Sequence, residues 1–160
     1  MAVRRHQITR YGGYFMNQET QPVGVWNQAE LAQKLLMDVE TGSSTAGNWI
    51  NGRIVGLLAS PFDSTATDIA TGVAAIPAGS SSPRHSHRAE EIAIILSGTG
   101  AIEIGDKSYP VKQGDVVLNP PDIPHRTVAD KSGTLAVLWI YSRAESALRW
   151  LHDGPVSEEV

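Results

Sequence analysis

The spacing of apolar positions changes along the chain, from a helical period near the N-terminus to short strand-like runs further on. The helical stretch contains Leu31, Ala32, Leu35, Leu36 and Val39, which recur at the three- and four-residue steps of one helix face. Asn27 precedes this stretch and Glu30 follows three residues later, a pattern typical of a capped helix start. The spacing predicts one amphipathic helix over about residues 28–40, ending before Gly42.

Short aliphatic and β-branched runs dominate the chain after that helix, and turn residues separate them. The runs are "RIVGLLAS", "DIATGVAAI", "EIAIILS", "GAIEIG", "GDVVLN" and "GTLAVLWIYS". No helical pattern lies between them, which favours an antiparallel sandwich or barrel over an α/β sheet. The Gly- and Ser-rich stretch "TGSSTAGNWING" before the first run is interpreted as a loop.

The two ends of the chain carry weaker patterns. The first 26 residues are polar and rich in Gly and Gln, and are interpreted as an arm or an irregular cover. Ser142 and Glu145 mark the start of a short C-terminal helix, followed by a frayed tail. We therefore predict one domain in three parts: an arm and helix at 1–52, a β-barrel at 53–141, and a C-terminal helix and tail at 142–160.

Composition excludes several classes of protein. The 160 residues carry a net charge of −4, and basic residues cluster only in "VRRHQITR", so nucleic acid and anionic membranes are poor partners. The absence of cysteine excludes disulfides and thiolate metal sites. The N-terminus lacks the apolar run of a secretory signal, and no window approaches the about 20 apolar residues of a membrane span. We expect a cytoplasmic protein.

Two histidines one residue apart raise the question of a metal site. In an extended chain, His85 and His87 present their imidazoles to one face, and Glu91 shares their parity if the strand continues through a short kink. His125 follows the turn-forming "NPPDIP". Three imidazoles and a carboxylate suit a divalent first-row metal such as iron, manganese, nickel, copper or zinc. An isolated pair of this kind is, however, more commonly solvated than metal-bound.

The spacing around these residues decides between the two interpretations. Residues 79–98 follow G-x5-H-x-H-x3-E-x6-G, and residues 114–125 follow G-x5-P-x-D-x2-H after a 15-residue gap. This pair of motifs resembles that of the cupin superfamily, in its small single-domain members. Asp122 stands where the family has glycine, but aspartate tolerates the left-handed backbone that this turn needs. Ala129 stands where the family often has asparagine, which is not a metal ligand.

The resemblance covers about residues 53–141 and carries structural expectations. It implies an all-β double-stranded β-helix, the cupin jelly-roll barrel, flanked by the N-terminal arm, one N-terminal helix and the short C-terminal helix. It also implies one divalent transition metal in the mouth of the barrel, with His85, His87, Glu91 and His125 as its ligands. Cupins are commonly homodimers with N-terminal segments that reach across to the partner, so we expect a homodimer.

Other charged residues near the motifs are assigned to the outer surface. Arg84 and Arg88 have the parity opposite to that of the ligands, and Arg126 is adjacent to His125. Glu103 is placed on an exposed strand face, with a buried proton acceptor as the alternative. The remaining histidines, His6 and His152, are expected on the surface.

The parity of Glu91 predicts which residues line the pocket. Ala93, Ile95 and Thr127 should face inward, together with either Trp139 and Tyr141 or their neighbours. A lining of this kind is mostly apolar. It favours a flat or partly apolar organic molecule over a sugar phosphate, which would need several cationic side chains.

Three classes of function remain open, and the first is preferred. A dioxygenase would bind a small enol, phenol or hydroxy-ketone at the metal, with Glu91 as a ligand or as a catalytic base. A redox-neutral isomerase, lyase or polyketide-cyclase-like enzyme would use the metal as a Lewis acid. The third class is a non-catalytic barrel that binds a small molecule.

Overall fold

The computed structural model describes residues 24–61, 64 and 66–147. Helix α1, Gln28–Thr41, begins where the sequence predicts it, because the Asn27 side chain accepts hydrogen bonds from the backbone N–H groups of Ala29 (3.0 Å) and Glu30 (3.1 Å). The helix ends at Gly42, whose φ of 68° is the left-handed conformation that closes many helices. The predicted helix over residues 28–40 is therefore confirmed.

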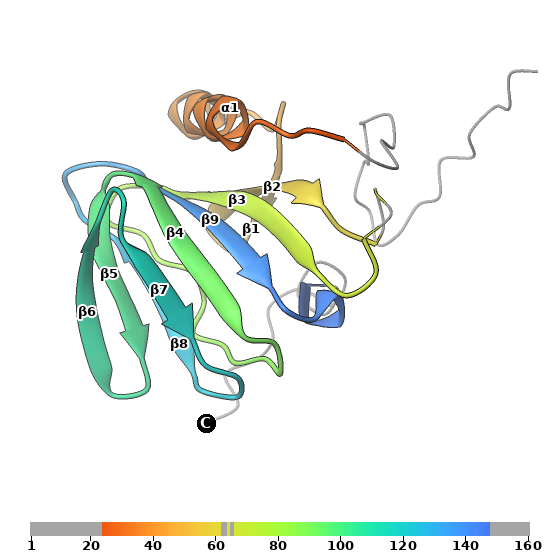
Figure 1. The fold of residues 1–160 in the computed structure, drawn as a ribbon. Coiled ribbons are helices and arrows are strands. Elements are labelled where there is room, and N and C mark those ends of the chain that lie inside the picture. Colours follow the sequence, from red (N-terminus) through yellow and green to blue (C-terminus); the bar gives the residue numbers. More distant parts are fainter. Residues whose placement is uncertain (1–23, 62–63, 65, 148–160) are drawn as a thin grey trace, which may run out of the picture.

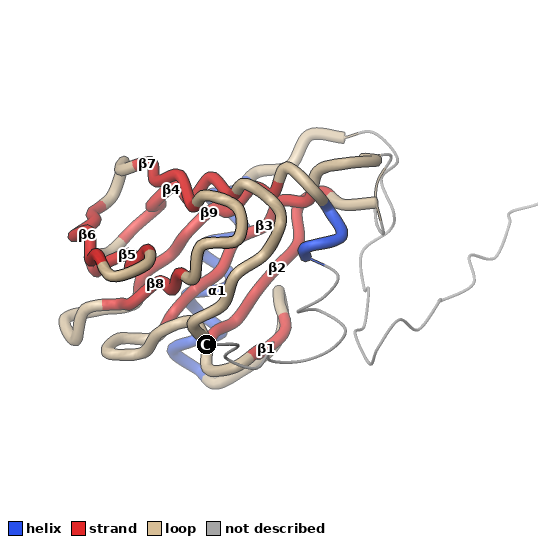
Figure 2. Tube along the Cα trace, turned by 90° about the horizontal axis from the view of Figure 1, so that it is seen from below, coloured by secondary structure: helices blue, strands red, loops and turns tan. Residues whose placement is uncertain are grey.

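β-Strands are the main regular structure of the described chain, and they form two antiparallel sheets (Figure 1). One is six-stranded, in the order β1-β2-β3-β9-β4-β7, and the other is three-stranded, in the order β6-β5-β8. The strands are β1 (Asn48–Ile50), β2 (Arg53–Ala59), β3 (Ala70–Ile76), β4 (Glu91–Ser97), β5 (Thr99–Ile104), β6 (Lys107–Lys112), β7 (Val116–Asn119), β8 (His125–Ala129) and β9 (Leu135–Tyr141). Figure 2 shows the two sheets as opposite layers of the all-β jelly roll that the sequence predicts.

Strands β1, β6 and β8 were not predicted, because turn-forming or polar residues dominate their sequences. The stretch taken for a loop ends in a β-hairpin, in which Asn51 and Gly52 form the turn with φ of 49° and 80°. Strand β6 contains Pro110 and is mostly exposed, as an edge strand of the smaller sheet can be. Strand β8 is short and begins directly after the prolines of the second motif.

Helix α1 covers the outer face of the larger sheet (Figure 1). Leu31 and Leu35 pack there against Ile54 and Val73. A second cluster fills the space between the sheets: Ile76, Ala93, Ile95, Ile102, Val111, Ala129, Leu135 and Val137. Burial of these side chains supplies the main driving force for packing the layers.

Several predictions concern the ends of the chain. Residues 144–147 are helical, but the rest of the predicted C-terminal helix and the tail lie outside the described residues. The predicted arm, apart from residues 24–26, also lies outside them, as do His6 and His152. Among the described residues, no helix is both long enough and apolar enough to cross a membrane.

Candidate metal centre

A backbone bridge brings the first histidine of one motif to the histidine of the other. His85 N–H donates to His125 O (3.0 Å) and His125 N–H donates to His85 O (2.8 Å). Residues that exchange both hydrogen bonds in an antiparallel pair project their side chains to the same face. The two imidazole rings accordingly lie with centroids 4.6 Å apart.

The chain between His87 and Glu91 does not continue as a strand. Residues 88–89 form a bend, and β4 begins only at Glu91, so strand parity is not what aligns the two side chains. His87 is instead tied to the second motif, because its carbonyl accepts a hydrogen bond from the Asp122 N–H (2.8 Å). Asp122 has a φ of 60°, which confirms the left-handed turn expected at this position.

The four predicted ligand residues converge on one point. His85, His87, Glu91 and His125 each offer one donor atom, and these atoms all lie within 4.8 Å of one another. Glu91 Oε2 lies 3.1 Å from His87 Nε2 and 3.1 Å from His125 Nε2. Glu91 and both of these histidines are buried. The group could hold a metal ion.

Each of the three imidazoles is oriented by a carbonyl oxygen of the nearby backbone. The Nδ1 atoms of His85, His87 and His125 contact the carbonyl oxygens of Pro83 (2.8 Å), Ala89 (2.9 Å) and Ile123 (2.8 Å), respectively. A carbonyl oxygen can only accept, so each Nδ1 carries the proton and donates. In the neutral rings, Nε2 is then the atom with a free lone pair, the arrangement that metal-binding histidines show.

The donor chemistry of the group fits a divalent cation. An unprotonated Nε2 and a carboxylate oxygen repel each other at 3.1 Å unless a proton or a cation lies between them. Ligands at about 2.0–2.2 Å from one ion, at a right angle to each other, lie about 3.0 Å apart. Three imidazole nitrogens and one carboxylate oxygen suit iron, manganese, nickel, copper or zinc, so the residues fit the predicted cofactor.

Electrostatics keep these side chains in the forms that bind metal. Burial raises the pKa of the Glu91 carboxyl, but when a proton rather than a cation lies between Oε2 and the Nε2 atoms, the hydrogen bonds with His125 and His87 outweigh burial and bring the pKa to about 2. Burial lowers the pKa of His85 to about 4, and repulsion from His125 adds to this effect. At neutral pH, Glu91 is therefore ionised and His85 is neutral, as coordination requires.

Comparison with known proteins gives the family. The family model described as "Cupin domain" matches residues 72–141. An uncharacterized protein from Streptomyces coelicolor is 30% identical over 79 residues, which are 49% of this chain and 74% of that protein. The chain belongs to the cupin superfamily.

Further similarities of this cupin are consistent with that assignment. An uncharacterized protein from Methanocaldococcus jannaschii is 39% identical over 54 residues, which are 33% of this chain. The matched segment spans 43% of that relative, less than half of its length. The crystal structure of an RmlC-like cupin from Shewanella frigidimarina superimposes with a TM-score of 0.56 at 14% identity, covering 67% of this chain and 90% of that one. The similarity to the structure from Shewanella frigidimarina shows that the two chains share the fold.

A small hollow adjoins the ligand group of this cupin. Its volume is about 40 Å³, and its wall includes His85, Glu91 and His125. Trp139, Tyr141 and Thr127 also line it, which settles which face of β9 looks inward. Ala93 and Ile95 face inward as predicted, but they are part of the buried core between the sheets.

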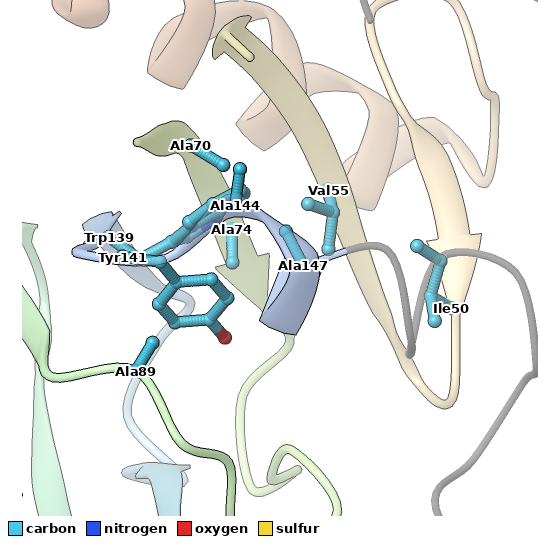
Figure 3. Close-up of a cluster of buried hydrophobic side chains, with 9 residues drawn as sticks. All are labelled: Ile50, Val55, Ala70, Ala74, Ala89, Trp139, Tyr141, Ala144 and Ala147. Carbon is cyan, nitrogen blue, oxygen red and sulfur yellow. The ribbon is translucent and has the colours of Figure 1, made fainter. Parts of the chain in front are cut away.

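The indole of Trp139 fits in this position because the residue opposite it on β3 is a glycine. The two strands pair Gly72 with Trp139, and a Cβ on Gly72 would lie 2.6 Å from Trp139 Cζ2. The indole therefore lies directly on the backbone of β3. Tyr141 packs against Trp139, with ring centroids 5.0 Å apart, and against His87, at 4.6 Å. Figure 3 shows the Tyr141 ring beside Ala89.

Two residues of the site were missed in the sequence. Arg53 lines the hollow and is only 7% exposed. Asn119 is paired with Glu91 across β4 and β7, so both side chains project from the same face of the sheet. Its Oδ1 is buried and has no hydrogen-bond partner among the described residues. Arg53 has the same strand parity as Val55, which could have suggested that it lines the hollow. Asn119 precedes two prolines and therefore resembles an ordinary turn residue.

The charged residues assigned to the outer surface lie away from the hollow. Arg126 binds Glu103 through two hydrogen bonds, from Nε to Oε2 (2.7 Å) and from Nη2 to Oε1 (3.1 Å). Arg84 lies 3.6 Å from the same carboxylate, and the hydrogen bond with Arg126 leads the effects that lower the Glu103 pKa. Arg88 and Glu90 are exposed. The predicted outward orientation of Arg88 is confirmed.

Proposed function

We propose that this cupin is a mononuclear metal-dependent enzyme that acts on a small oxygenated organic molecule, an enol, a phenol or a hydroxy-ketone. His85, His87, Glu91 and His125 would hold one divalent transition metal, and the preferred reaction is dioxygenation. The observation that carries the proposal is the set of Nδ1 contacts with backbone carbonyls, which leaves the three Nε2 atoms free in a group whose donor atoms all lie within 4.8 Å of one another. Such an arrangement binds a cation without reorganisation.

The roles of the chain's own residues follow from their surroundings. Glu91 Oε2 lies 3.1 Å from both His87 Nε2 and His125 Nε2, which favours Glu91 as a ligand over Glu91 as the group that removes a substrate proton. Trp139 and Tyr141 offer flat apolar surfaces beside the ligand group, where they can pack on an unsaturated substrate and exclude water. The buried side chains of His87 and His125 are held in position by their hydrogen bonds to the carbonyl oxygens of Ala89 and Ile123.

When bound, the metal supplies polarisation of a substrate oxygen and, if it is redox-active, electron exchange with dioxygen. Four protein donors would leave part of the coordination of such an ion open to small molecules, which distinguishes this kind of site from a closed structural one.

A redox-neutral isomerase, lyase or polyketide-cyclase-like reaction is the second candidate. It is favoured by Tyr141, whose ring contacts His87 and lines the hollow. A phenol there can exchange a proton with an enolate without any oxidation. The third candidate is a cupin that binds a small molecule without converting it.

Metal analysis combined with oxygen uptake tests the proposal. We expect about one equivalent of a redox-active metal, and oxygen consumption with members of a panel of enols and phenols. His87→Ala should lose metal and activity, Glu91→Gln should weaken both, and Glu90→Gln, at the exposed neighbouring carboxylate, should change neither. Zinc with turnover in the absence of oxygen would exclude dioxygenation and support the second candidate. A protein that binds no metal and tolerates His87→Ala would leave only the binding function.

We further propose a homodimer, as the resemblance implies. The outer face of edge strand β7 exposes Val116 (62%) and Leu118 (52%), which pair with Ile94 and Ile92 of β4. Apolar side chains in such a cluster are typical of contact surfaces between proteins. Light scattering after size exclusion should give a dimer mass for the wild type and a monomer mass for Leu118→Lys. A monomeric wild type would refute the proposal.

A further inference from the structure

One buried amide beside the candidate ligands has an oxygen without a partner. The Asn119 side chain is 1% exposed, and its Oδ1 has no hydrogen-bond partner among the described residues. Such atoms are rare in folded proteins, because a polar group that has given up its contact with water normally finds another partner. The position of Asn119 in the fold indicates what that partner is.

Strand β7 directs Asn119 into the space between the two sheets. Val116 and Leu118 are exposed on its outer face, whereas Val117 packs against the core between the sheets. Side chains alternate along a strand, so Asn119 projects to the same inner side as Val117. On the neighbouring strand β4, the residue opposite Asn119 is Glu91 (Figure 1). Opposed residues of an antiparallel pair have Cβ atoms about 4.5–5.5 Å apart, so the amide and the carboxylate share one region.

The chain that follows Asn119 is also fixed to the ligand group. Two prolines lead from Asn119 to Asp122, whose N–H donates to the carbonyl oxygen of His87 (2.8 Å). Asn119 thus lies between a strand pair that carries one candidate ligand and a turn that is hydrogen-bonded to another. Both attachments keep the amide close to the ligand group.

A cation is the partner that fits this oxygen. Asn119 is not one of the residues that line the hollow, where a substrate or a water molecule would bind. Water does not reach its Oδ1, so a hydrated or bulky partner has no room beside it. A bare divalent ion needs less space, because its oxygen ligands lie at only about 2.0–2.2 Å. Glu91, on the same face, already offers an oxygen to such an ion.

We propose that Asn119 Oδ1 is a fifth protein donor to the divalent metal, beside His85, His87, Glu91 and His125. The donor set then has three imidazole nitrogens and two oxygens. Carbonyl and carboxylate oxygens suit manganese, whereas zinc is satisfied by four donors, so the amide shifts the preference of the site toward manganese. This assignment rests on the proposed function only for metal binding at the four candidate ligands.

The ratio of manganese affinity to zinc affinity tests the fifth donor. Titration of each metal into the metal-free chain, in competition with a chelating dye, gives both dissociation constants for the wild type and for Asn119→Leu, which has a similar size and no donor atom. Manganese binding should weaken at least about tenfold more than zinc binding in Asn119→Leu. Asn119→Asp keeps an oxygen donor and should retain manganese binding. An unchanged ratio in folded Asn119→Leu would overturn the inference.

Thermal melting distinguishes a metal donor from a residue that only supports the fold. Without metal, the unpaired amide oxygen is a cost, so Asn119→Leu should melt at the temperature of the wild type or above it. Added manganese should raise the melting temperature of the wild type more than that of the variant. A lower melting temperature of the metal-free variant, with an equal rise on adding manganese, would refute the inference. If Asn119→Leu does not fold, the smaller Asn119→Val replaces it in both measurements.

Gln28 provides a matched control. Its Oε1 is also buried without a hydrogen-bond partner among the described residues, but it lies at the start of α1, which covers the outer face of the larger sheet. Gln28→Leu therefore removes an equivalent amide away from the candidate ligands and should leave the ratio of the two affinities unchanged. A change as large as that in Asn119→Leu would contradict the assignment to Asn119.

The same titrations separate the fifth donor from the proposed function. If His87→Ala loses both metals while Asn119→Leu keeps the wild-type ratio, the fifth donor fails and metal binding by the four candidate ligands stands. If the ratio depends on Asn119 but the loaded protein consumes no oxygen and converts no substrate, the fifth donor stands and the enzymatic function fails. A wild type that binds neither metal would refute both.

Discussion

Gly72 and Trp139 lie opposite each other on β3 and β9, and the indole ring occupies the space that a side chain at Gly72 would need. A Cβ on Gly72 would lie 2.6 Å from Trp139 Cζ2 and 2.3 Å from the Gly56 carbonyl oxygen. We expect Gly72→Ala to lower the free energy of unfolding by about 1–3 kcal/mol, the usual cost of overpacking. Urea unfolding followed by tryptophan fluorescence measures this loss. Gly133→Ala, where a Cβ meets nothing within 4 Å, should cost little.

Asn119 places a neutral amide beside Glu91. A carboxylate at this position should change how far added metal raises the melting temperature. Asn119→Asp adds a second carboxylate to the same buried face, so repulsion should lower the melting temperature of the metal-free protein. A bound divalent cation offsets that repulsion, so the rise in melting temperature on adding metal should exceed that of the wild type. Thermal melting with and without metal measures both effects. Equal shifts in the two proteins would contradict the prediction.

Metal binding should stabilise the fold through the ligand group. A ligand that binds only the folded state adds about 2.7 kcal/mol when its concentration is 100 times Kd. We expect nickel or zinc to raise the melting temperature of the wild type, and a chelator to reverse the rise. His125→Ala should lose the response, because it removes one of the four candidate donor atoms while keeping the backbone bridge between the motifs. A full response in this variant would place the metal elsewhere.

The metal-free protein should lose stability as the pH falls below about 6.5. The pKa of His85 drops from 6.5 to about 4 on folding, so the unfolded chain binds more protons in this interval and acid favours unfolding. The contribution is at most about 3 kcal/mol. Glu91, with a pKa lowered from 4.5 to about 2, extends the loss to lower pH in the same direction. Urea unfolding as a function of pH should show a shallower slope between pH 6.5 and 4 for His85→Gln.

Asp38, in the last turn of α1, holds the loop that leads to β1. Its carboxylate accepts hydrogen bonds from Thr45 N (3.0 Å), Thr45 Oγ1 (2.6 Å) and Ala46 N (2.9 Å), and the side chain is 1% exposed. Asp38→Ala would leave these buried donors unpaired, at a cost of about 2–3 kcal/mol. Chemical unfolding measures the loss. Glu40→Ala, at an exposed position of the same helix, should stay within about 0.5 kcal/mol of the wild type.

The sequence predicted most of the secondary structure and the grouping of the four candidate ligands, because these features leave local patterns. Leu31 and Leu35 repeat at helical spacing, and aliphatic runs mark β3, β4 and β9. The four candidate ligands stand at fixed distances within two motifs. The structure brings them together, although a backbone bridge and a bent segment align them where strand parity was expected.

The parts that could not be predicted depend on register and on contacts between distant segments. The inward orientation of Trp139 follows from its pairing with Gly72, which no local pattern reveals. Arg53 was not recognised as a pocket residue because the preceding hairpin was taken for a loop. Asn119 gained its importance only when β7 paired with β4 and placed it opposite Glu91.

The candidate ligands come from both layers of the jelly roll, since Glu91 belongs to the larger sheet and His125 to the smaller one. The distances between their donor atoms therefore depend on the distance between the two sheets. Side chains that set this distance, such as Ile102 and Val137, lie between the sheets and touch no ion. A methylene added or removed there would change the distances between the candidate ligands, so the size of the ion that they could hold would depend on the hydrophobic packing as much as on the histidines.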